Sequence, residues 1–295
     1  DMIIEGARKF HIMSYPIPIM MIGNQNKLTP QEMRNTYDRD IDSLCVHSRE
    51  RETLKVQQKR LKFKKQDLKY QQVSIDFQEL LIKDAKETVW IGTEDEDGFD
   101  YTISNYYEFE HNLPATNSNV VGFPARCEPR KNIHFLQKID SVALTSEETF
   151  DGIFDDYKKK VKFSNIEIDD YRVDKIENFY KRTDWGISHS CYENEPFGYS
   201  IFQSIDFGKI PILHKNWCKD MEYPFRATTQ KQFEKQVAKI SKLSVEDKNT
   251  YLSNLRSYLS KYTSVEKWRD ELLSIYNQDG DQIWLPTDIS PSKSV

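Results

Sequence analysis

The sequence lacks the long apolar runs, paired cysteines and excess of basic residues that mark several large classes of protein. No stretch approaches the roughly 18 consecutive apolar residues of a membrane-spanning helix, and no signal-peptide pattern is visible, which predicts a cytoplasmic protein with no membrane association. The four cysteines form no CxxC pair, which indicates reduced structural thiols rather than a disulfide framework or a zinc site. The net charge of −5 excludes a globally basic nucleic-acid binder.

What the chain has is enough apolar and aromatic material for sizeable cores. Of its 295 residues, 38% are hydrophobic and 13% aromatic, although 30% are charged. A chain of this length forms one large domain or two of ordinary size. We therefore expect a folded protein of one or two domains.

Strand and helix patterns alternate regularly from residue 119 onward. The expected strands are 119–123, 141–145, 161–166, 185–189, 210–213 and 223–226. The expected helices between them are 131–139, 147–157, 171–182 and 198–207, followed by helices at 229–243, 245–262 and 265–278. This alternation predicts an α/β fold with a Rossmann-type parallel sheet, in which ligands bind at the carboxyl ends of the strands.

The first part of the chain has a weaker pattern of the same kind. Its expected strands are 10–13, 42–47, 88–91 and 101–104, and its expected helices are 29–40 and a long one at 49–86. The region is short for a complete second domain.

The most informative stretch runs from Cys191 to Leu213, between two predicted strands. A helix opens at Gly198, where a glycine lets a ligand approach the free backbone amides that favour an anion. Glu195 precedes this helix start, and Gln203 follows Glu195 by eight residues, about two helical turns further on. The loop could hold a phosphate on amides and sugar hydroxyls on side chains, which is the chemistry of a nucleotide-sugar site.

A second cluster follows the strand at 119–123. A turn containing Gly122 leads to Arg126, and Lys131 stands five residues later at the expected start of a helix. Both cations are expected at the carboxyl edge of the sheet, where a diphosphate would accept charge-assisted hydrogen bonds. The alternative is that the two side chains are simply solvated.

Together these motifs resemble the donor-binding half of the retaining GT-B glycosyltransferases. Arg126 and Lys131 match the family's arginine–lysine spacing, and Glu195, Phe197 and Gly198 match the first half of its Glu-x7-Glu motif. Gln203 stands where the family has the second glutamate. Gly198-Tyr199, and the extra residue after Gly208, are similar to the DNA α-glucosyltransferases of T-even phages, which modify hydroxymethylcytosine.

The resemblance implies a role for each matching residue. Arg126 and Lys131 would neutralise the leaving diphosphate, and Glu195 would orient the sugar. The donor would also contact a further set of residues: Gly122, Phe197, Gly198, Tyr199 and Gln203. The expected co-substrate is a UDP-sugar, with no metal and no other cofactor, and the anomeric configuration would be retained.

The resemblance also implies a division of the chain. Residues 1–115 would form an acceptor-side domain, residues 116–265 the donor-binding domain, and residues 265–280 a helix that returns to the first domain, ahead of a tail at 286–295. Because 115 residues are few for a full acceptor domain, it is either reduced or completed by segments outside this chain or by a second chain.

The acceptor depends on how one basic stretch is interpreted. Residues 49–69 contain nine basic residues against three acidic ones, which favours a polyanion such as duplex DNA. The acceptor-side candidates within it are Lys55, Lys59, Arg60, Lys62 and Lys65. The simpler alternative is a solvated helix face.

Two other functions remain open from the sequence. The chain could be a polysaccharide- or lipid-directed glycosyltransferase, with the basic stretch merely solvated. It could also be a non-catalytic subunit of a split enzyme that binds DNA or a nucleotide sugar, since the second glutamate is replaced by Gln203.

Overall fold

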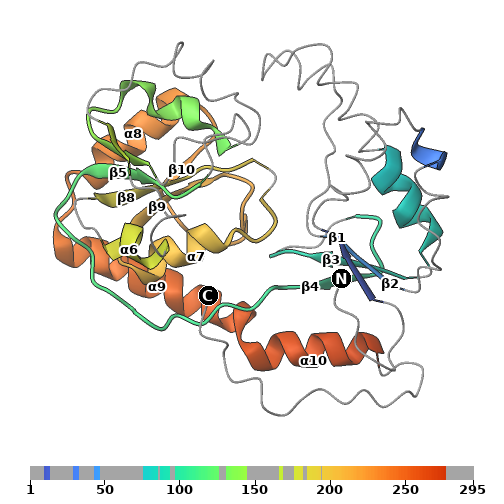
Figure 1. Cartoon of the computed structure of the whole chain (residues 1–295). Coiled ribbons are helices and arrows are strands. Elements are labelled where there is room, and N and C mark those ends of the chain that lie inside the picture. Colours follow the sequence, from blue (N-terminus) through green and yellow to red (C-terminus); the bar gives the residue numbers. More distant parts are fainter. Residues whose placement is uncertain are drawn as a thin grey trace.

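The computed structural model describes residues 10–13, 29–32, 43–46, 76–85, 87–93, 97–125, 131–144, 166–168, 176–181, 185–193 and 195–276. Within these ranges the chain forms two parallel sheets, each with helices packed on it (Figure 1). The expectation of an α/β fold built on a parallel sheet is confirmed. The predictions that concern residues 33–40, 49–75, 126–130, 145–165 and 277–295 lie outside the described residues.

The smaller sheet contains four strands in the order β1-β2-β3-β4, and every neighbouring pair is parallel. Its strands are β1 (Phe10–Met13), β2 (Ser43–Val46), β3 (Glu87–Ile91) and β4 (Tyr101–Ile103). A helix at 76–84 precedes β3.

The larger sheet contains six strands in the order β10-β9-β8-β5-β6-β7, again all parallel. The strands are β5 (Val120–Phe123), β6 (Val142–Leu144), β7 (Ile166–Ile168), β8 (Trp185–Ser190), β9 (Ile210–His214) and β10 (Arg226–Ala227). A parallel sheet is normally covered on both faces. Here α8 (Gln230–Ile240) and the 3-10 helix η2 (Ile133–Lys138) lie on one side, with α6 (Ile176–Lys181), α7 (Tyr199–Asp206) and α9 (Val245–Thr263) on the other (Figure 1).

Three sequence boundaries differ from the structure. The segment expected as a helix at 131–139 forms the 3-10 helix η2 instead, preceded by Asn132 with a left-handed backbone (φ 55°). Of the strand expected at 161–166, residue 166 is described, and it begins β7, which continues to Ile168. The strand expected at 223–226 is reduced to Arg226–Ala227.

The central strand of the larger sheet, β8, lies in the core along its whole length. All six residues of β8 are buried, including Ser188, His189 and Ser190. The hydroxyl of Ser188 hydrogen-bonds to those of Ser190 (3.0 Å) and Ser204 (2.9 Å). The two buried serine hydroxyls of β8 are therefore hydrogen-bonded to each other and to α7, as buried polar groups usually are.

Two features connect the sheets. The segment 105–119 runs from β4 to β5, and the buried carboxylate of Asp206 accepts hydrogen bonds from the backbone amides of His111 (3.0 Å) and Asn112 (2.7 Å) within it. After α9, helix α10 (Val265–Tyr276) packs on the smaller sheet, with Leu272 and Ile275 against Val89, Ile91 and Ile103.

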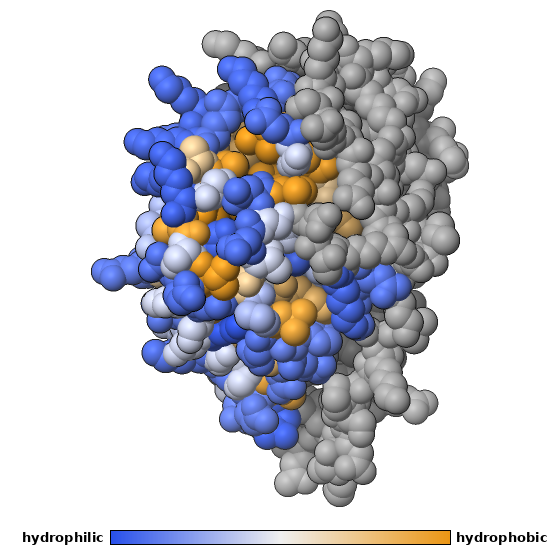
Figure 2. All heavy atoms as spheres, turned by 90° about the vertical axis from the view of Figure 1, so that its left-hand side faces the viewer, coloured by the Kyte–Doolittle hydropathy of each residue, from blue (hydrophilic) through white to orange (hydrophobic). Residues whose placement is uncertain are grey.

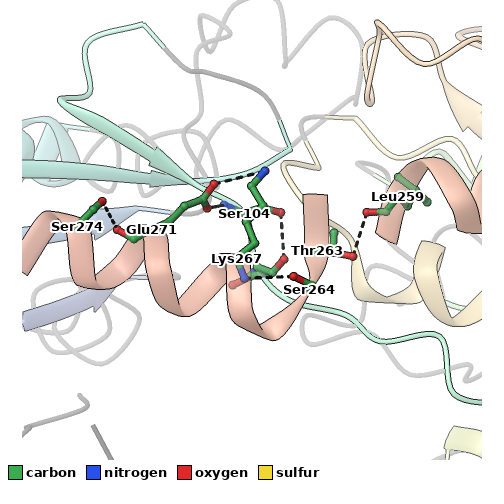
Figure 3. A network of polar contacts seen from close by, with 8 residues as sticks. Ser104, Leu259, Thr263, Ser264, Lys267, Glu271 and Ser274 are labelled. Carbon is green, nitrogen blue, oxygen red and sulfur yellow. Dashed lines mark hydrogen bonds and ion pairs between the residues drawn. The ribbon is translucent and has the colours of Figure 1, made fainter. Parts of the chain in front are cut away.

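The turn from α9 into α10 is fixed by a polar network (Figure 3). The hydroxyl of Thr263 lies within hydrogen-bond distance of two carbonyl oxygens, those of Leu259 (3.2 Å) and Tyr107 (3.0 Å). In return, the backbone amide of Tyr107 donates to the carbonyl of Thr263. Further along, the Ser104 amide donates to Glu271 (3.4 Å). The end of the larger unit is thus tied to the start of the connecting segment.

The surface on the side of the larger sheet is mostly polar. Figure 2 shows this face dominated by hydrophilic residues, with smaller apolar patches between them. No helix among the described residues is both long and apolar enough to cross a membrane.

Gly122 has a packing role that differs from its expected place in a donor-binding turn. It lies inside β5, and a Cβ atom built on it would come within 1.8 Å of the Trp185 ring. The fully buried indole of Trp185 therefore occupies the space that any side chain at position 122 would need. Gly122 thus leaves room for the indole that the neighbouring strand β8 places over it.

We expect Gly122→Ala to destabilise the fold by about 1–3 kcal/mol or more, because it overpacks the core against Trp185. Urea denaturation of both proteins would measure the difference in stability. Combining the change with Trp185→Leu, which makes room, should give a double variant more stable than the sum of the single effects predicts. Strict additivity would show that the two positions do not compete for space.

Candidate functional site

Two of the predicted site residues meet at the carboxyl edge of the larger sheet. Lys131 follows the loop after β5, and Glu195 lies in the loop between β8 and α7. The Lys131 Nζ forms an ion pair with the Glu195 Oε2, and the two side chains are 22% and 20% exposed. Residues 64 positions apart in the sequence are thus brought together, with part of each side chain reachable by a ligand.

Asn132 holds Lys131 in this place. Its side-chain amide donates to the carbonyl of Cys191 (2.8 Å), directly after β8. The ring Nε2 of His189 lies 3.0 Å from the Asn132 carbonyl and, facing an acceptor, must carry the proton. Asn132 is buried and takes up the left-handed conformation that asparagine tolerates better than most residues. These two bonds, here called the Asn132 clamp, join the β5 loop to the end of β8.

His189 is neutral in this environment. The side chain is fully buried, and burial lowers the pKa of His189 to about 3. The rings of Phe123, Phe135 and Phe233 surround it, with centroids 5.0, 5.8 and 4.6 Å away. His189 is therefore a structural residue of the clamp, and its environment disfavours protonation near neutral pH.

Tyr192 lies beneath the ion pair. The Lys131 Nζ is 4.6 Å from the centroid of the Tyr192 ring, a distance at which a cation is attracted to the aromatic face. Tyr192 is buried, and burial raises the pKa of its phenol. The lysine thus has a carboxylate on one side and an aromatic ring on another, which limits the directions that it can take.

Helix α7 begins directly beside Glu195. Gly198 caps it with φ 79°, and a Cβ atom there would lie 2.9 Å from both the Glu195 Cγ and the Ile201 Cδ1. Only glycine fits this combination of left-handed backbone and close contact. The N-terminus of a helix attracts negative charge, so an anion approaching α7 would meet the helix dipole and the Lys131 ammonium together.

The remaining predicted donor residues divide into an outer and an inner group. Tyr199 is 47% exposed and Gln203 is half-buried, and their spacing of four residues places them on the same face of α7. Phe197 is different: its ring is buried and stacks on Phe202 with centroids 4.3 Å apart, and its carbonyl accepts from Trp217 Nε1 (2.9 Å). The side chain of Phe197 therefore anchors the loop in the core and is not a ligand contact.

The end of β3 reaches this loop from the smaller sheet. Thr93 donates to the carbonyl of Pro196 with its amide (2.9 Å) and its hydroxyl (3.2 Å). Pro196 immediately follows Glu195. The site therefore has a neighbour from the first part of the chain, which the sequence alone did not suggest.

Several predicted site residues lie outside the described parts of the chain. Arg126 is one of them, and so are the five acceptor-side candidates of residues 49–69: Lys55, Lys59, Arg60, Lys62 and Lys65. Within the described ranges, no group of three or more His, Cys, Asp or Glu side chains is arranged to hold a metal ion. Cys191 and Cys218 are buried.

Three residues at the site, Asn132, Tyr192 and Thr93, were not predicted from the sequence. The only local signal for Asn132 is its residue type, because asparagine adopts the left-handed backbone more readily than most residues. Tyr192 and Thr93 acquire their positions only from tertiary packing, and no local pattern indicates them.

The neutral state of His189 makes stability depend on pH. Because the folded pKa of about 3 is below the ordinary value of 6.5, the unfolded chain binds the extra proton, and stability falls as pH decreases from 6.5 towards 3. Between pH 6.5 and 5, His189 should account for a decrease in stability of up to about 2 kcal/mol. In His189→Gln, which keeps a donor for Asn132, this part of the pH dependence should disappear in urea titrations.

A matched control is His214→Gln, because His214 is only partly buried at the end of β9. That variant should keep the pH dependence of the original protein. If His189→Gln and His214→Gln gave the same curves, His189 would not be the buried neutral group described here.

Comparison with known proteins does not assign this chain to a family. No protein-family model and no curated protein matches this chain. Any inference about function therefore depends on the geometry of the site and on the motifs in the sequence.

Proposed function

We propose that this chain is a glycosyltransferase of the retaining GT-B type that takes its sugar from a nucleotide diphosphate sugar, with a UDP-sugar as the expected donor. The observation that carries the proposal is the meeting of Lys131 and Glu195 beside the N-terminus of α7, at the carboxyl edge of a parallel sheet. Ligands of such sheets bind at this edge.

The chemistry of the lysine suits a departing diphosphate. When the bond between sugar and diphosphate breaks, negative charge grows on the leaving oxygen, and a preorganised cation stabilises it. Lys131 is held by the Asn132 clamp, by Glu195 and by the Tyr192 ring, so little reorganisation is needed for it to meet that charge. Arg126, five residues earlier, would supply the second cation by resemblance.

The carboxylate suits the sugar. The phosphates of a bound donor would pair with the Lys131 ammonium. The Glu195 oxygens would then be able to accept hydrogen bonds from the sugar hydroxyls. Gln203, on the outer face of α7, would bond the ribose hydroxyls in place of the family's glutamate, with a neutral rather than a charge-assisted hydrogen bond. Retention of the anomeric configuration follows from the resemblance alone.

The arrangement of the chain agrees with this proposal. A GT-B enzyme has two α/β units with the substrates between them. Here Thr93, two residues after β3 of the smaller sheet, contacts the Glu195 loop, and α10 returns to pack beside β4. The acceptor hydroxyl would approach from the smaller unit. Similarity to the phage enzymes favours a hydroxymethylated base in DNA as the acceptor, with polysaccharide and lipid as alternatives.

The direct test is turnover of a panel of UDP-sugars, measured as released UDP. Lys131→Met should reduce kcat about 100-fold, because it removes one electrostatic group from the leaving phosphate. The matched control is Lys138→Met, an exposed lysine at the end of η2, which should leave kcat unchanged. Equal rates in Lys131→Met and the original protein would refute the assignment of the leaving-group cation.

A second variant separates donor binding from chemistry. Gln203→Ala should raise KM for the UDP-sugar up to about tenfold and keep kcat, because it removes one ground-state hydrogen bond. Gln230→Ala on α8 is the control, since its side chain bonds Glu234 (3.0 Å). A drop in kcat with unchanged KM would instead place Gln203 in the chemical step.

A further inference from the structure

Helix α8 has two faces of opposite character. Its buried face consists of Phe233 and Ile240, with the partly buried Val237 packed against the same core. Four exposed lysines follow the opposite face: Lys231, Lys235, Lys239 and Lys242. The last of these stands in the turn that continues the helix, with its amide bonded to the Lys239 carbonyl (3.1 Å).

The lysines form a single line. At 100° per residue the four Cα positions fall within about 80° of arc, and their spacing of mostly four residues separates neighbours by about 6 Å along the axis. Within the described parts of the chain, none of the four makes an ion pair or a hydrogen bond through its side chain. In a chain with a net charge of −5, this face is a local concentration of uncompensated positive charge.

A groove beside α8 extends this face. It has a volume of about 380 Å³ and is lined by Lys235 and Lys239 together with Lys215, Arg226, Thr228, Gln232, Gln236 and Ala227, so it contains no carboxylate. The Arg226 guanidinium donates to the carbonyls of Trp217 (2.6 Å), Cys218 (2.8 Å) and Met221 (2.9 Å). Arg226 thereby fixes the loop that follows Lys215.

We propose that the lysine face of α8, with the groove beside it, is a docking surface for the phosphate backbone of duplex DNA. The line of charges is about 16 Å long, which is comparable to about five phosphates of one strand at 3.4 Å of axial rise each. The exposed positions of α8 carry lysine, glutamine and alanine and no large apolar side chain. The exposed side of the helix therefore lacks the apolar residues with which an amphipathic helix enters a bilayer. This surface depends neither on the proposed sugar transfer nor on residues 49–69.

The test compares two variants of equal charge in binding a labelled duplex of about 20 base pairs by fluorescence anisotropy over a range of salt concentrations. The first variant replaces Lys231, Lys235, Lys239 and Lys242 by glutamine. The second replaces four exposed lysines on other elements: Lys83, Lys138, Lys181 and Lys261.

The slope of log K against log salt should decrease in magnitude by about 0.9 for each lysine–phosphate interaction that the substitutions remove. The α8 variant should therefore show a slope smaller by up to about 3.6 and an affinity more than tenfold lower at low salt, with the control variant close to the original protein. Equal effects in the two variants, or no DNA binding by the original chain, would overturn the proposal. Stronger binding to anionic lipid vesicles than to DNA would overturn it in favour of a membrane surface.

The same variants separate this inference from the proposed function. UDP release from a UDP-sugar without DNA involves the edge of β5 and β8 and should be unchanged when the four α8 lysines are replaced. Weakened DNA binding with intact UDP release would support the surface. UDP release that fell only in the α8 variant, with DNA binding intact, would contradict it.

Discussion

The geometry of the candidate site depends on how the loop after β5 is joined to the end of β8. Asn132 does this with two hydrogen bonds. Its side-chain amide donates to the Cys191 carbonyl, and its backbone carbonyl accepts from the His189 ring. Both bonds are buried, where an unpaired polar group costs about 1–3 kcal/mol. The clamp must therefore form as a unit, and once formed it leaves the adjacent Lys131 facing Glu195.

The carboxylate side of the site is fixed by the core in a similar way. Phe197 stacks on Phe202 and binds Trp217 through its carbonyl, so the residues before it have little freedom. Gly198 then turns the chain into α7 with a backbone that other residues avoid. Because Thr93 also holds the Pro196 carbonyl, Glu195 lies between an anchored loop and a contact from the other sheet. The polar site is a consequence of apolar packing immediately beneath it.

Much of the fold could be predicted from the sequence because the strands from β5 onward are short apolar runs separated by helical patterns. The pairing of Lys131 with Glu195 at one edge also agrees with the expectation from strand order. Local pattern could not reveal that Gly122 accommodates Trp185 or that Phe197 is a core residue, because both roles come from contacts between distant segments. It also predicted a helix at 131–139, where the structure has a left-handed Asn132 followed by the 3-10 helix η2. The glycosyltransferase assignment stays a proposal that rests on residue types and their placement.

The central claim is that the edge formed by β5, β8 and α7 is a site for a nucleotide diphosphate sugar. Calorimetric titration of the chain with a UDP-sugar, UDP and UMP tests it most directly, because Lys131 and the α7 N-terminus are expected to bind the second phosphate. We expect that the UDP-sugar and UDP bind, and that both bind more tightly than UMP. Failure of all three to bind, or equal affinities for UDP and UMP, would contradict the claim.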